Sequence, residues 1–198
     1  MDPATTAFDA TFWITALVVL CLLMLSGFFS GSETALTAAS RGKLRAQADK
    51  GDRGAEAALS VKEDDERLIG AILMGNNIAN VIATSLATAA LTKVLGANGV
   101  AVASLVMTAL ILIFAEVLPK TYAISNPERS AGIAAPLIAL VIKVLAPMVG
   151  AVRVVVRATL RLVGVTVGKD DKMLSVRDEI EGALRIGHSE GVVEKEDR

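Results

Sequence analysis

The sequence predicts an all-α membrane protein with three transmembrane helices per protomer, further helices along the inner membrane surface, and a cytoplasmic helical tail. Two observations predict this fold class. The chain of 198 residues is 53% hydrophobic with a mean hydropathy of +0.56, which is too apolar for a soluble domain of this size. Its charged residues gather in residues 41–67 and again after Arg153, which leaves long apolar runs between them.

Charge and residue types exclude several function classes. A formal net charge of -1 gives no indication of a nucleic-acid partner. Cys21 is the only cysteine, so an intrachain disulfide is impossible and a cysteine-based metal site is not expected. The only histidine, His188, falls in a polar, acidic tail, where neither a zinc site nor a Ser/His/Asp triad is expected.

The first expected span covers residues 12–39, which is long enough to cross a hydrocarbon core of roughly 30 Å. Residues 1–10 contain no Lys or Arg and therefore lack the basic start of a cleaved signal peptide. The second half of the span carries small and polar residues where leucines would be expected. Among them, Ser26, Ser30 and Glu33 follow i, i+4, i+7 spacing and share one helix face.

The loop over residues 40–67 is polar and basic, and its composition predicts two short helices, the second ending near Asp64. By the positive-inside rule this loop is cytoplasmic, so the N-terminus lies outside. Its basic residues are Arg41, Lys43, Arg45, Lys50, Arg53, Lys62 and Arg67.

The second span is expected over residues 68–95, followed by an uncharged tight turn at residues 96–99. Four polar residues repeat every four positions and form one stripe of this helix. They are Asn76, Asn80, Thr84 and Thr88. Such a stripe also occurs where polar side chains only hold neighbouring helices together, each contributing about 1 kcal/mol or less.

The third span, residues 100–118, ends in an acid, a proline and a base. A carboxylate such as Glu116 is costly in lipid, so it is expected to face a bundle interior, a cavity or a cation. Pro119 has no N–H to give to the carbonyl of Ala115 and crowds it sterically. Carboxylate and carbonyl oxygens are the hard ligands that Mg²⁺ and Ca²⁺ prefer.

The apolar run at residues 131–149 is long enough for a fourth span but is interrupted by Pro136, Lys143 and Pro147. If this run crossed the membrane, the basic residues from Arg153 onward would lie outside, against the charge rule. We therefore expect an interfacial or re-entrant helix that stays on the inner side. Asn126 is its expected N-cap, with Pro127 at the first helical position.

A separate amphipathic helix on the inner surface is expected over residues 153–167, because Arg153, Arg157 and Arg161 recur every four residues opposite apolar side chains. The charged tail that follows is expected to contain a helix capped by Ser175.

The chain is thus expected to have three parts. They are a three-span core (residues 1–126, including the loop 40–67), juxtamembrane helices (127–168) and an acidic helical linker (169–198).

Helical rise places the polar clusters of the three spans in the same inner half of the bilayer. Hydroxyls from Ser26 and Ser30, the amide of Asn76 and the Glu116 carboxylate can therefore converge. This oxygen-only set suits a partly dehydrated Mg²⁺. Polar faces on three short spans cannot all be buried within one protomer, so a two-fold homodimer is expected.

Four motifs of the chain resemble the transmembrane domain of the CorC/CNNM (cyclin M-like) magnesium transporters. The resemblance covers nearly the whole chain in the same order, although Ala115 stands where the family usually has Gly before the acid. The motifs are SGFFSGSETAL (26–36), LMGNNIAN (73–80), EVLPK (116–120) and NPER (126–129).

The resemblance implies a homodimer in the cell membrane, with the bacterial inner membrane as the expected location, an outside N-terminus and a cytoplasmic C-terminus. It implies Mg²⁺ export, with Na⁺ entry as the candidate coupling, and no enzymatic activity. It also implies that the tail leads towards a nucleotide-binding CBS-pair domain; we expect that domain, and ATP binding with it, to be missing from this chain.

The candidate residues fall into two groups. The metal set is Ser26, Ser30, Asn76, Asn80, Ala115 and Glu116, and the structural or gating set is Glu33, Pro119 and Lys120. Glu33 either pairs with Lys120 and holds the first and third spans together, or is a carboxylate solvated at the interface.

Two other functions compete with transport. The first is a sensor that binds Mg²⁺ and regulates another carrier without moving ions. The second is an intramembrane hydrolase using Ser26 or Ser30, which lacks a membrane-embedded His or Lys base near either serine.

Overall fold

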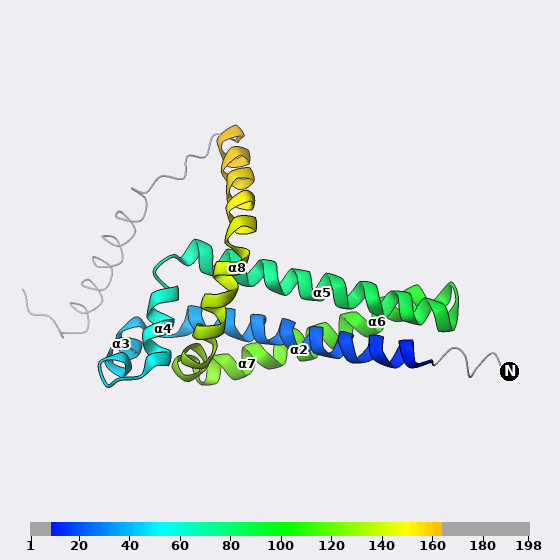
Figure 1. The fold of residues 1–198 in the computed structure, drawn as a ribbon, viewed down its shortest axis with the longest axis horizontal. Coiled ribbons are helices and arrows are strands. Elements are labelled where there is room, and N and C mark those ends of the chain that lie inside the picture. The colour runs from blue at the N-terminus through cyan, green and yellow to red at the C-terminus, as the bar shows by residue number, and fades with distance from the viewer. Residues whose placement is uncertain (1–8, 164–198) are drawn as a thin grey trace, which may run out of the picture. The chain divides into compact units, whose positions relative to one another are not determined.

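The computed structural model describes residues 9–163, and every regular element in that range is helical. The chain divides into two compact units, Met1–Val149 and Gly150–Arg198. The tail helix predicted from Ser175, the linker and His188 lie outside the described residues. Figure 1 shows the elements, which are α2 (Ala10–Ala38), α3 (Arg41–Ala48), α4 (Arg53–Val61), α5 (Asp65–Leu95), α6 (Asn98–Leu110), η1 (Ile111–Val117), α7 (Leu118–Ser125) and α8 (Pro127–Leu162).

Three helical layers meet along α2 in the first unit. The helix α5 packs against α2 over most of its length, and α6 folds back on α5 after the predicted turn. The segments η1 and α7 continue from α6 and pack against α2 (Figure 1). The helix α5 and the segment η1, which carry the polar residues of the other two predicted spans, therefore both contact α2.

Aspartate caps set where the helices start. The Asp9 carboxylate accepts from the N–H of Phe12 at 2.9 Å, and that of Asp64 accepts from Arg67 at 3.0 Å. Each satisfies one of the N–H groups that a helix N-terminus leaves open. The two short helices predicted between residues 40 and 67 are confirmed as α3 and α4.

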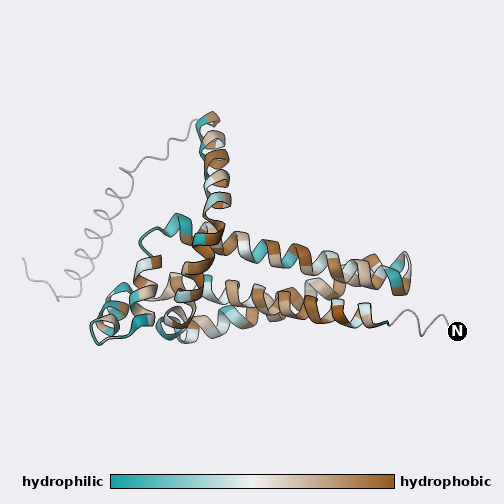
Figure 2. Ribbon diagram, in the orientation of Figure 1, coloured by the Kyte–Doolittle hydropathy of each residue, from teal (hydrophilic) through white to brown (hydrophobic). Residues whose placement is uncertain are grey.

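Within residues 9–163, four helices are long and apolar enough to cross a membrane: α2, α5, the continuous segment Asn98–Ser125, and α8. Brown, hydrophobic residues dominate α2 and α6 in Figure 2, whereas teal, hydrophilic residues gather at α3. Large apolar side chains point outward, with Leu17 61% and Leu105 75% exposed. Such surfaces require lipid or a partner, so the chain is a multi-pass membrane protein. The count of three spans stays a prediction.

One expectation about α8 is wrong. The sequence predicts two separate helices after Asn126, but α8 runs without interruption from Pro127 to Leu162, with Pro136 and Pro147 inside it. Each proline removes a single backbone donor. Burial of Ala135 and Ile138 in the core of the first unit favours the helix on both sides of Pro136. The predicted start at Pro127 is confirmed.

Lys62 joins the α3–α4 segment to the end of α2. Its ammonium is buried and donates to the carbonyls of Leu36 and, at 2.8 Å, Ala39. These belong to the last carbonyls of α2, which have no partner within the helix. Burial lowers the pKa of Lys62 and the nearby Arg41 lowers it further, while Asp65 acts in the opposite direction.

Replacing Lys62 by Met should destabilise the fold, because two buried carbonyls lose their donor. We expect a loss of about 2 kcal/mol, equivalent to a fall in Tm of roughly 4–8 °C. Thermal unfolding in detergent would measure it. Lys50→Met is the matched control, since Lys50 is exposed. Equal Tm values for the two variants would show that Lys62 does not support α2.

Candidate functional site

A hydrogen-bonded chain of polar side chains connects α2, α5 and η1. Ser26 Oγ of α2 donates to Asn76 Oδ1 of α5 at 2.5 Å. Asn76 Nδ2 donates to Glu116 Oε1 of η1 at 3.5 Å. This hydrogen-bonded network therefore contains one residue from each of the three predicted polar clusters.

Two further polar side chains lie next to this hydrogen-bonded network. Asn80, one turn along α5, donates from Nδ2 to Asn76 Oδ1 at 3.4 Å. Its own Oδ1 is buried without a partner among the described residues, and so is the hydroxyl of Ser30, one turn along α2 from Ser26. A buried polar atom without a partner costs about 1–3 kcal/mol, so two of them within one helical turn of Ser26 and Asn76 need an explanation.

The backbone around Glu116 is a π-helix, which the sequence analysis did not predict. In η1 the register is i→i−5, and at its end the N–H of Leu118 donates to the carbonyl of Ile113. Pro119 follows at the start of α7 and brings no N–H to this change of register. The Ala115 carbonyl therefore stays a predicted ligand.

Glycines let these helices approach closely. A Cβ on Gly27 would lie 3.1 Å from the Phe114 carbonyl oxygen and 3.2 Å from Pro119 Cγ. On α5, a Cβ on Gly75 would lie 2.6 Å from the ring of Phe29. Larger residues at either position would push α2 away from η1 or α5 and open the Ser26–Asn76–Glu116 chain.

The charge of the site comes from one carboxylate and one ammonium. Glu116 Oε2 lies 3.2 Å from Lys120 Nζ, one turn away in α7. The alternative pair between Glu33 and Lys120 is not formed, and half-buried Glu33 has no ion pair within residues 9–163. No group of three or more His, Cys, Asp or Glu side chains gathers in this range. A cation held here would depend on neutral oxygens.

The predicted residues are brought together to different degrees. Ser26, Asn76, Asn80 and Glu116 form one network, and Ser30 is buried beside it. The rest of the α5 stripe differs, because Thr88 donates to the Thr84 carbonyl of its own helix at 2.8 Å.

Sequence reasoning missed one feature of the site, the π-helical register of η1. The register returns to α-helical just before Pro119. No side-chain pattern indicates that change.

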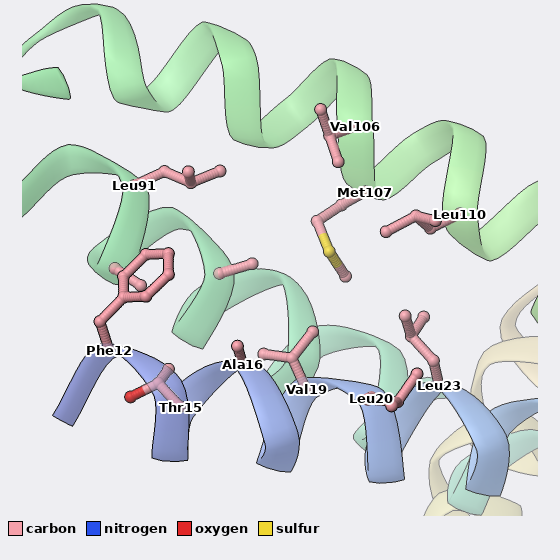
Figure 3. A pocket seen from close by; sticks show the side chains of 12 residues that line it. Phe12, Thr15, Ala16, Val19, Leu20, Leu23, Leu91, Val106, Met107 and Leu110 are labelled. Carbon is pink, nitrogen blue, oxygen red and sulfur yellow. The ribbon is translucent and has the colours of Figure 1, made fainter. Parts of the chain in front are cut away.

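A pocket of about 380 Å³ lies between α2, α5 and α6 (Figure 3), towards the start of α2. Val19, Met107 and Leu110 point into it, and the hydroxyl of Thr15 already donates to the Thr11 carbonyl of its own helix. Thr15 is the one polar residue of this lining, which contains no carboxylate and no amide side chain. The pocket is therefore not a candidate for a cation site.

Comparison with known proteins agrees with this architecture. Residues 16–197 match the family model CNNM, described as the cyclin M transmembrane N-terminal domain. The UPF0053 inner membrane protein YfjD of Escherichia coli is 37% identical over 141 residues, covering 71% of this chain and 33% of that protein. A UPF0053 protein of Haemophilus influenzae is 29% identical, covering 80% of this chain and 38% of its own length.

A chloroplastic DUF21 domain-containing protein of Arabidopsis thaliana is 31% identical over 182 residues, which cover 92% of this chain and 27% of the relative. The chain thus spans about a third of the length of these three curated relatives. The family match extends over all three polar clusters and the helices that position them. The chain belongs to the CNNM family, as its cyclin M transmembrane domain.

Proposed function

We propose that this chain transports Mg²⁺ across the cell membrane through the site between α2, α5 and η1. The observation that carries the proposal is the convergence of Ser26, Asn76 and Glu116 from three different helices. Hydroxyl, amide and carboxylate oxygens of this kind suit Mg²⁺ better than softer metals. Export, with Na⁺ entry as the coupling, is the direction that the family resemblance favours.

The two unpartnered oxygens support a ligand at this place. The Ser30 hydroxyl and Asn80 Oδ1 are buried beside the network, and neither has a partner within the described residues. A bound cation would supply the interaction that both atoms lack. With Glu116 as the only anionic ligand, the ion would keep a net positive charge, so it would be held loosely enough to be released.

The rival sensor function uses the same ligands and differs only in whether ions move. Flux into liposomes that contain this chain alone separates the two functions. Mg²⁺ binding without flux would favour a sensor that regulates another carrier.

The serine hydrolase is disfavoured by the contacts of its two candidate nucleophiles. Ser26 donates to an amide oxygen, and Ser30 has no hydrogen-bond partner in residues 9–163. A serine nucleophile requires an adjacent base.

Contacts at both ends of the run 131–149 support the three-span topology. At its start, Glu128 lies 3.2 Å from Lys43 of α3, and Ala131 shares a core with Ala58 of α4. At its end, a Cβ on Gly70, in the second turn of α5, would lie 2.9 Å from Val149. Both ends thus lie near the α3–α4 segment or the adjoining start of α5. This part of α8 is therefore proposed to stay on the cytoplasmic side.

The proposed assembly is a homodimer, because polar groups also face outward. Asn77 is exposed on α5 beside the buried network. A second protomer would cover such groups without loss to lipid. A CBS-pair domain on the C-terminal side of the linker is proposed as a partner of this membrane domain.

Glu116→Gln should severely weaken Mg²⁺ binding and flux, because Gln preserves the shape of the side chain but removes the only anionic ligand. We expect binding to weaken roughly 100-fold, corresponding to about 3 kcal/mol of charged interaction. Isothermal titration with Mg²⁺ and liposome flux measure the two effects. Asn76→Ala should weaken both less, since water can partly replace a neutral ligand.

The control for this prediction is Glu56→Gln, which removes an exposed carboxylate of α4. It should leave binding unchanged. Normal binding and flux by Glu116→Gln would make Glu116 a structural residue and disprove the proposed site.

Ser30→Ala and Ser26→Ala separate a ligand from a structural hydroxyl. The Ser30 hydroxyl makes no hydrogen bond in the described part of the chain, so its removal should weaken Mg²⁺ binding by about tenfold without lowering the Tm. Ser26→Ala should lower both, because it also breaks the bond to Asn76, worth about 1 kcal/mol. A Ser30→Ala variant with unchanged affinity would remove Ser30 from the ligand set.

The proposed topology predicts which single cysteines an impermeant reagent reaches from outside, in a Cys21→Ala background because Cys21 is exposed. Cysteines at Asp9 and Asn98 should be labelled, while those at Asp52 and Arg157 should not. Labelling of whole cells followed by mass shift on a gel gives the readout. Outside labelling at Arg157 would mean that α8 crosses the membrane.

A further inference from the structure

Both oxygens of the Glu116 carboxylate already have partners. Oε1 accepts from Asn76 Nδ2 at 3.5 Å, and Oε2 lies 3.2 Å from Lys120 Nζ. Asn76 Oδ1 likewise accepts from both Ser26 and Asn80. The strongest candidate ligands for a cation are therefore held by groups of the protein itself.

Lys120 supplies the positive charge in this arrangement. It lies one helical turn from Glu116 across the junction of η1 and α7, and the two side chains are 42% and 31% exposed. The i, i+4 pair of Arg45 and Asp49 in α3 is more open, at 75% and 69% exposed. The Glu116–Lys120 pair also differs from the Arg45–Asp49 pair because the Glu116 carboxylate accepts a hydrogen bond from Asn76 of another helix, α5.

A Mg²⁺ ion cannot share Glu116 with this ammonium. Magnesium requires oxygen contacts of about 2.0–2.1 Å in near-octahedral geometry. An ammonium at the second oxygen of the same carboxylate would repel the ion at short range in a partly dehydrated site. The lysine stem is long and flexible, so its charge can swing away without backbone movement.

We propose that Lys120 is a tethered cation that competes with Mg²⁺ for Glu116. It neutralises the carboxylate when no ion is bound, leaves when Mg²⁺ enters, and returns to drive the ion out. Lys120 thereby weakens Mg²⁺ binding and speeds release. This role rests on the proposed function, because it requires Mg²⁺ to bind at Glu116.

If Lys120 competes with Mg²⁺ for Glu116, removing the lysine charge should increase the affinity for Mg²⁺. Lys120→Met in the full chain should bind Mg²⁺ roughly tenfold more tightly, because one repelling charge is gone. At saturating Mg²⁺, its liposome flux should be slower, since release is slower. Lys120→Arg keeps the charge and should keep an affinity near that of the wild type. Isothermal titration with MgCl₂ gives the affinities.

The matched control is Lys93→Met. Lys93 forms a comparable ion pair with Asp9 at 2.8 Å. Asp9 is the N-cap of α2 and lies 17 residues before Ser26, which corresponds to about 26 Å along the helix. This variant changes net charge equally and should leave the Mg²⁺ affinity unchanged. A gain shared by Lys93→Met and Lys120→Met would reflect overall charge and overturn the proposal.

A second measurement uses the wild-type chain and does not depend on the folding of a variant. Saturating Mg²⁺ should increase the rate at which an amine reagent labels Lys120, because the ammonium leaves Glu116. Labelling of Lys93, read in the same mass spectra, should not change. An unchanged labelling rate of Lys120 would disprove the proposal that Mg²⁺ displaces the lysine from Glu116.

The outcomes separate this proposal from the proposed function. If the wild type binds Mg²⁺ and Glu116→Gln does not, an unchanged or weaker affinity in Lys120→Met refutes only the competition. If the wild type does not bind Mg²⁺, the proposed function and the role of Lys120 fail together.

Discussion

A carboxylate in an apolar span must be compensated, and the arrangement of the first unit depends on how this is done for Glu116. The negative charge of Glu116 is balanced by the Lys120 ammonium, which lies 3.2 Å from Oε2. The other carboxylate oxygen accepts a hydrogen bond from Asn76 of α5. The bond from Asn76 requires α5 to lie close to η1, with α2 beside both. An uncompensated charge would be expensive enough to displace the helix that carries it.

The close approach that brings these groups together is achieved through backbone rather than through large side chains. Gly27 leaves room for the Phe114 carbonyl, and Gly75 accommodates the ring of Phe29. Small residues at helix contacts are usual in membranes, where apolar side chains gain little by leaving lipid. In this chain the hydroxyls of Ser26 and Ser30 are both buried, and that of Ser26 donates to the Asn76 amide of α5.

The end of α2 connects the site to the polar segment that follows it. Buried Lys62 donates to the carbonyls of Leu36 and Ala39, and Arg41 donates to the Lys62 carbonyl at 2.7 Å. Residues of α8 complete this core. Buried hydrogen bonds and a shared apolar core therefore hold the end of α2 to α3 and α4.

The sequence by itself determined the helical membrane class, the positions of the long helices and the polar residues that could meet, because hydropathy and periodicity are local properties. It also contained the motifs of the CNNM family. Only the tertiary structure decided that Lys120 pairs with Glu116 rather than with Glu33, and that the backbone around Glu116 takes a π-helical register. It also joined two expected helices into α8. Partner choice and helix register depend on how neighbouring helices pack, and no local pattern records that packing.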